Sequence, residues 1–189
     1  MSVYLQQGLT LRRKEIARYL GCRGGIPEGE LAQEIELAAE ALEQGSYRVS
    51  WVRLPLARED GLLHFGSALT LESRDLAENL KGCEEAVLFC ATLGPSVDRA
   101  IRKNRLHPSL ALVWDAVGTA AIEQLCDDFC SSLPRPQRPR FSPGYGDLPL
   151  ETQGPLLQLL EAERLLGVGL TDSLLMTPTK SVTAFVGLL

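Results

Sequence analysis

The chain has 189 residues, 45% of them hydrophobic and 23% charged, so it is long enough to bury a sizeable apolar core and has the composition of an ordinary soluble protein. Its net charge of −5 argues against a nucleic-acid binder, because such proteins usually present a basic surface. No apolar run approaches the roughly 18 residues that cross a bilayer, and the N-terminus lacks a signal-peptide pattern, so we expect a cytoplasmic protein that does not engage a membrane.

The first quarter of the chain is predicted to be helical. Apolar residues spaced by three and four indicate an amphipathic helix over 9–21 and a longer helix over 28–44. Glycine stands at the end of each pattern, which is typical of helix termination. The segment between them, CRGGIPEG, is rich in Gly and Pro and is predicted to be a turn.

Strand signals follow this helical part. Residues 47–54 are rich in β-branched and aromatic residues, and Pro55 is expected to close the strand. Two short strands are predicted within 62–71, and a helix opened by a serine cap over 73–82. The unbroken apolar run at 85–94 is typical of a strand buried on both faces.

The remaining pattern alternates helices with one unusual loop. Helices are predicted over 95–106 and 109–132, the second with small residues in its middle that allow close packing. The loop 133–150 is rich in Pro and Arg, and loops of this length inside a compact domain tend to be functional. A helix over 151–167 and one or two strands within 171–189 complete the chain.

The loop contains the sequence RFSPGYGD over residues 140–147. Pro143-Gly144 predicts a type II turn, and Gly146 frees the backbone again after Tyr145. Arg140 is placed to bind a carboxylate or phosphate through two parallel hydrogen bonds, and Tyr145 to stack on a flat group. This pattern favours a small anionic or zwitterionic ligand, and the alternative is a rigid surface loop whose arginines are solvated.

The sequence shows no pattern of a catalytic or metal site. The two histidines stand alone, and the five cysteines form no CxxC pair. We therefore predict no catalytic residues and no metal ligands.

Several stretches resemble the activation domain of cobalamin-dependent methionine synthase. RFSPGYGDLPLETQ (140–153) is similar to a segment of that family carrying an R-x-x-P-G-Y motif, and Pro178–Thr183 is similar to its P-x-x-S-V-S element. LRRKEIARYLG, ATLGPSVDRAIRKNRL and WDAVGTAAIE resemble the free-standing members. The resemblance covers most of the chain.

The resemblance implies an α+β fold in which a twisted antiparallel sheet is flanked by helices. It implies a single activation domain over 1–189, with a helical part over about 1–45 and a mixed α/β core over about 46–189. The ligand would be S-adenosylmethionine, and cobalamin would be met only on a partner, the core protein of a cobalamin-dependent methionine synthase. A flavodoxin-like or other electron donor would complete the system, of which this chain would be a component rather than a complete enzyme.

The same resemblance assigns ligand contacts to residues of the loop and the long helix. They are Arg140, Ser142, Pro143, Gly144, Tyr145, Gly146 and Glu123. Arg140 would hold the ligand carboxylate, while Arg135 and Arg138 lie outside the motif and are expected to contribute little. Thr119 aligns with a family acid, Glu123 stands one turn later, and the family's N-terminal acidic ligand has no clear counterpart. The family also continues with further ligand contacts beyond the position equivalent to Leu189.

Two alternatives remain open at this point. In the first, the chain is an accessory or reactivation protein for another corrinoid-dependent methyltransferase. In the second, it is a non-catalytic scaffold that has kept the fold without the ligand.

Overall fold

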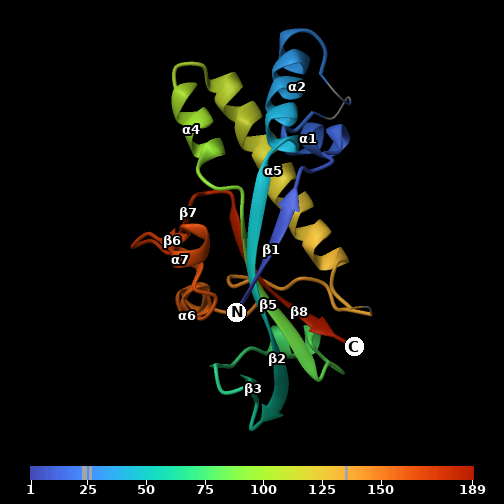
Figure 1. Cartoon of the computed structure of the whole chain (residues 1–189), viewed down its shortest axis with the longest axis vertical. Coiled ribbons are helices and arrows are strands. Elements are labelled where there is room, and N and C mark those ends of the chain that lie inside the picture. Colours follow the sequence, from blue (N-terminus) through green and yellow to red (C-terminus); the bar gives the residue numbers. More distant parts are fainter. Residues whose placement is uncertain (23–24, 26, 135) are drawn as a thin grey trace.

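An antiparallel sheet runs through the centre of the molecule in the computed structural model, which describes residues 1–22, 25, 27–134 and 136–189 (Figure 1). Its four main strands are neighbours in the order β1 (Ser2–Gln7), β2 (Ser46–Glu59), β5 (Glu85–Thr92) and β8 (Ser181–Leu188). The predicted α+β fold with a helix-flanked antiparallel sheet is confirmed. The other elements, in chain order, are α1 (Arg13–Tyr19), α2 (Glu30–Glu43), β3 (Leu62–Phe65), β4 (Leu69–Leu71), α3 (Arg74–Asn79), α4 (Ser96–Lys103), α5 (Pro108–Ser131), the 3₁₀ turn Leu150–Thr152, α6 (Gln153–Leu159), α7 (Ala162–Leu166), β6 (Gly169–Leu170) and β7 (Met176–Thr177).

Helices cover both faces of the sheet and divide the interior into two cores. Along β5, Val87 and Phe89 face the core formed with α1, α2 and α5. Leu88 and Cys90 face a second core formed with α3, α6 and α7. Because side chains alternate along a strand, an unbroken apolar sequence is what a strand between two cores requires. The prediction for this segment is confirmed.

Strand β2 is longer than predicted, because Pro55 does not end it. The first half of β2 pairs with β1 and its last residues pair with β3, while β5 follows it on the other side. The Pro55 carbonyl accepts a hydrogen bond from Gly66 on the β3 side at 2.8 Å, and the Leu56 N–H donates to Glu84 on the β5 side at 2.8 Å. Pro55 therefore lies between the part of β2 that pairs with β1 and the part that pairs with β3. No hydrogen-bond donor is needed at this junction, so the N–H that proline lacks is not missed.

The predicted helix over 151–167 is interrupted, which is a second correction. Helix α6 ends at Leu159 and α7 begins at Ala162, and Glu161 between them has a φ of +48°. Since this backbone conformation cannot continue a right-handed helix, the chain turns here although its apolar periodicity persists. Of the predicted turn at 22–29, Arg23, Gly24 and Ile26 lie outside the described residues.

Figure 1 shows α1, α2, α4 and α5 at one end of the molecule and the β3 hairpin at the other. Helices α6 and α7 lie beside the middle of the sheet. None of the helices in the described parts of the chain is long and apolar enough to cross a membrane.

Candidate functional site

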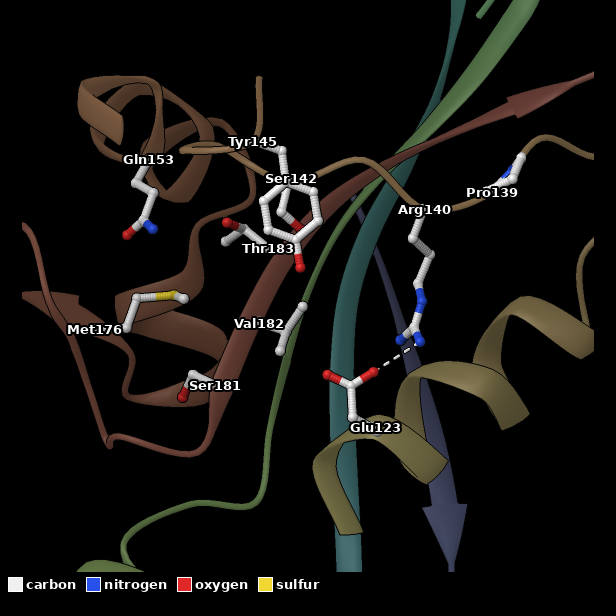
Figure 2. A pocket seen from close by; sticks show the side chains of 10 residues that line it. All are labelled: Glu123, Pro139, Arg140, Ser142, Tyr145, Gln153, Met176, Ser181, Val182 and Thr183. Atoms are coloured by element: carbon white, nitrogen blue, oxygen red, sulfur yellow. Dashed lines mark hydrogen bonds and ion pairs between the residues drawn. The ribbon is translucent and has the colours of Figure 1, made fainter. Parts of the chain in front are cut away.

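A cavity of about 420 Å³ opens between α5, β8 and the loop that joins α5 to α6 (Figure 2). This volume lies in the range of pockets that hold small organic ligands, about 300–1,000 Å³. Its lining residues are Glu123 from α5; Pro139, Arg140, Ser142 and Tyr145 from the loop; Gln153 from α6; Met176 from β7; and Ser181, Val182 and Thr183 from β8.

The loop lies against the outer edge of β8 and is fixed there by backbone pairing. Phe141 and Phe185 exchange hydrogen bonds of 3.0 and 2.8 Å, and the Arg138 N–H donates to the Gly187 carbonyl at 2.8 Å. Because the loop is paired to the strand, the residues that follow Phe141 enter the turn from a fixed position. The loop and β8 together form one wall of the cavity (Figure 2).

The predicted type II turn is present at the cavity mouth. The Tyr145 N–H donates to the Ser142 carbonyl at 3.1 Å, and Gly144 has the positive φ, +86°, that this turn requires at its third position. Ser142 and Tyr145 line the cavity, whereas Pro143 is buried beneath the turn and Gly144 is exposed at its tip. Tyr145 is 60% exposed, with its ring edge-on to Phe141 at 6.0 Å.

The second half of the loop motif holds the loop on α3 rather than lining the cavity. Asp147 accepts hydrogen bonds from the Ser73 hydroxyl and from the backbone N–H groups of Arg74 and Asp75, the last two at 2.8 and 3.2 Å. The Ser73 hydrogen bond is the main reason why the pKa of the Asp147 carboxyl is lowered. A Cβ on Gly146 would lie 2.0 Å from a carboxylate oxygen of Asp75, so glycine permits this close approach.

Arg140 is ion-paired with the long helix. Its Nη2 atom donates to Glu123 Oε2 and to Asp127 Oδ1, both at 2.9 Å. The Arg140 side chain is 24% exposed, whereas those of Glu123 and Asp127 are 44% and 62% exposed. Two predicted contact residues, Arg140 and Glu123, are therefore brought together at one side of the cavity (Figure 2).

Thr119 binds a lysine instead of lining the cavity. The Lys180 ammonium donates to Thr119 Oγ1 at 2.8 Å and forms an ion pair with Asp115 at 2.9 Å, and its side chain is only 12% exposed. Gly118 makes this contact possible, because a Cβ there would lie 3.2 Å from the lysine chain and 2.8 Å from Val97. The small residues of α5 therefore serve close packing, and the ion pair fixes the start of β8 on α5.

The opposite side of the cavity contains residues that sequence reasoning did not assign to the site. Gln153, Met176 and Thr183 lie there, and Ser181 is held by contacts with the Pro178 carbonyl (2.7 Å) and the Thr92 hydroxyl (2.8 Å). The similarity of Pro178–Thr183 to a family element was the available signal for the β8 residues. Gln153 ends the segment 140–153 that resembles the family, but it lies outside the R-x-x-P-G-Y motif, and Met176 lies outside both family elements.

Comparisons with known proteins found one family model and a solved structure that are similar to this chain. Residues 135–188 match the family model of the vitamin B12 dependent methionine synthase activation domain. Among solved structures, the chain is similar to the MetH reactivation domain bound to AdoHcy, with a TM-score of 0.70 and 14% identity over 99% of this chain and 78% of that chain. No curated protein matches the chain by sequence. The predicted resemblance is confirmed, in sequence for the C-terminal segment and in fold for the whole chain.

Proposed function

Because residues 135–188 match the activation-domain family and the whole chain has the fold of a reactivation domain, we propose that this protein binds S-adenosylmethionine. In this role it supports the reductive methylation of oxidised cobalamin on a separate methionine synthase.

One observation carries this proposal. Nine of the ten residues that line the cavity lie within 135–188, the segment that matches the family, and Glu123 is the tenth. The segment that matches the family therefore supplies almost the whole lining of the cavity. The relative whose fold the chain shares was solved with AdoHcy, a compound that differs from S-adenosylmethionine by one methyl group.

The charges beside the cavity fit a ligand that carries both signs. Arg140 contributes one positive charge and Glu123 and Asp127 one negative charge each, so the cluster has a formal charge of −1. A net negative cluster favours a cation such as a sulfonium or ammonium group, while Arg140 supplies donors for a carboxylate. S-adenosylmethionine contains all three groups, whereas a simple phosphate would meet the two acids unfavourably.

Bound S-adenosylmethionine would supply an electrophilic methyl group to reduced cobalamin on the partner protein. Such a direct displacement needs no general base on this chain, whose contribution is to hold and orient the ligand. Arg140 and Glu123 would fix the amino-acid end, and Ser142 and Tyr145 would hold the ligand at the mouth of the cavity. Tyr145, which is the most exposed of these, would then lie where the partner's cofactor approaches.

The partner would be a methionine synthase core that holds cobalamin, with a flavodoxin-like or other protein as electron donor. Service to a different corrinoid methyltransferase remains the alternative. Loss of the ligand, leaving a scaffold, is less compatible with a cavity that still pairs Arg140 with Glu123.

The first test is calorimetry with S-adenosylmethionine, accompanied by thermal unfolding. At a ligand concentration about 100-fold above Kd, binding stabilises the folded state by about 2.7 kcal/mol. For a chain of this size the midpoint should rise by about 5–10 °C. If millimolar S-adenosylmethionine produces no heat of binding and no shift of the unfolding midpoint, the proposal is refuted.

The second test reconstitutes reactivation. A methionine synthase core without its own activation domain, carrying oxidised cobalamin, is mixed with an electron donor, S-adenosylmethionine and this chain. We expect methionine formation to resume only when all components are present. Equal recovery without this chain would contradict the proposed role, and recovery of a different corrinoid methyltransferase alone would favour the alternative.

A further inference from the structure

Two residues that line the cavity each carry a buried polar atom with no hydrogen-bond partner in the described part of the chain. The atoms are Gln153 Oε1 and Thr183 Oγ1, on residues that are 7% and 2% exposed. Figure 2 shows the Gln153 amide and the Thr183 hydroxyl on the same side of the cavity, above the Met176 side chain. Both belong to secondary-structure elements, α6 and β8, that fix their positions.

Buried polar atoms without partners are rare in folded proteins, because desolvation without a compensating hydrogen bond costs stability. The neighbouring Ser181 hydroxyl shows that β8 can satisfy such groups, since it contacts both a carbonyl and a hydroxyl. An unpaired amide oxygen and an unpaired hydroxyl at one side of a cavity therefore point to a ligand that supplies a donor there.

The character of this side identifies the donor. The charged residues Arg140 and Glu123 lie across the cavity, while Gln153, Thr183 and Met176 are uncharged (Figure 2). A neutral, flat group that offers N–H donors fits such surroundings. The exocyclic amine of adenine has two N–H donors beside a ring nitrogen acceptor, an edge that a carboxamide recognises through paired hydrogen bonds.

We propose that Gln153 and Thr183 bind the adenine amine of the ligand and so select an adenosyl compound. This inference rests on the proposed function. Gln153 Oε1 accepts a hydrogen bond from the amine and the Thr183 hydroxyl accepts a second one. Met176 supplies a polarisable apolar contact for the ring. The amino-acid end then extends toward Arg140, so the two sides of the cavity recognise the two ends of one ligand.

The test pairs a change in the protein with a change in the ligand. Binding of S-adenosylhomocysteine is compared with binding of its analogue that has purine in place of adenine and so lacks the amine. For the parent protein we expect the analogue to bind about 10-fold more weakly, the loss of one or two neutral hydrogen bonds. Gln153→Leu and Thr183→Val should each weaken S-adenosylhomocysteine several-fold and leave the analogue nearly unchanged.

Stability of the ligand-free variants separates binding from folding. Replacing an unpaired buried polar group by an apolar one of similar shape is neutral or stabilising, so Thr183→Val should unfold at the same or a higher temperature. Asn79→Leu is the matched control, because Asn79 Oδ1 is also buried without a partner but does not line the cavity. We expect this variant to bind both ligands as the parent does.

The outcomes separate the two proposals. If the parent binds both ligands equally well, or if Gln153→Leu and Thr183→Val keep the full preference for the amine, the adenine assignment is wrong while the proposed function stands. If the parent binds neither ligand and no S-adenosylmethionine, both proposals fail together.

Discussion

Arg140→Ala tests whether the loop arginine binds ligand or only ties the loop to α5. In the ligand-free protein the change removes two ion pairs at 2.9 Å, to Glu123 and Asp127. Both acids are more than 40% exposed, so water can solvate them and the loss of stability should be about 0–1 kcal/mol. The fold should therefore survive the substitution.

The expected loss of ligand binding is larger. A charge-assisted hydrogen bond contributes roughly 1.5–3 kcal/mol, which corresponds to about 10- to 100-fold in Kd. Arg140→Lys should recover only part of it, because an ammonium lacks the planar two-pronged geometry. The assay is calorimetry with S-adenosylmethionine and with its decarboxylated analogue, which lacks the carboxylate. The parent should prefer the former, and Arg140→Ala should abolish this preference.

The control substitution must remove an arginine that forms an ion pair but does not line the cavity. Arg164, which pairs with Glu161 beside α7, meets this condition, so Arg164→Ala should bind as the parent does. Arg138 does not, because its guanidinium donates to the Lys81 carbonyl and its side chain lies over Gly187. Arg135 lies outside the described residues. Equal losses in Arg140→Ala and Arg164→Ala, or an unchanged carboxylate preference, would refute the assignment.

Three further predictions follow from the surrounding structure. Gly146→Ala should lower the free energy of unfolding, measured by urea denaturation, by about 1–3 kcal/mol, because φ is +52° and the new Cβ would meet Asp75. Gly61→Ala is the control for backbone strain alone, since Gly61 has a φ of +84° but open space around it. Equal losses in the two variants would show that Asp75 simply moves aside. The hydrogen bonds from Arg13 hold the pKa of the Glu43 carboxyl below 4.5, so the stability that Glu43 contributes is present above about pH 4.5 and is lost as pH falls through the folded-state pKa. Glu43→Gln should therefore destabilise the protein at pH 7 and progressively less in acid. A difference in stability that does not change with pH would contradict the ion pair. If the chain acts only by presenting S-adenosylmethionine to a partner protein, as proposed above, the isolated chain supplied with homocysteine, cobalamin and a methyl donor should form no methionine. Turnover by the isolated chain would overturn this prediction.

Much of the fold could be predicted because its signals are local. The apolar run of β5 and the Ser73 cap, whose hydroxyl accepts from Leu76 N–H at 3.0 Å, each lie within a few residues of what they specify. The predictions at Pro55 and Glu161 were wrong, because the conformation at each residue depends on parts of the chain that are distant in the sequence. A proline ends a strand only if its missing N–H is needed, and that depends on which strand lies beside it. The αL conformation of Glu161 is held by the surrounding structure and leaves no mark in the apolar pattern.

The cavity could be predicted only in part, for a related reason. The sequence located the loop wall, because Arg140 and the Pro143-Gly144 turn are recognisable by themselves. It could not show that Asp127 shares the guanidinium, since that contact depends on how α5 lies against the loop. Gln153 and Thr183 are 30 residues apart in the sequence and meet through the packing of α6 on β8, which no local pattern encodes.

The backbone pairing between the loop and β8 also covers the edge of the sheet, which limits pairing of β8 with other chains. Strand β8 ends in the sequence AFVGL, and an open apolar edge of this kind invites pairing with other chains. The loop occupies that edge through Phe141 and Arg138. A substitution that frees the loop to accept a larger ligand would also uncover the edge, so engineered changes in specificity at this site should be screened for self-association as well as for binding.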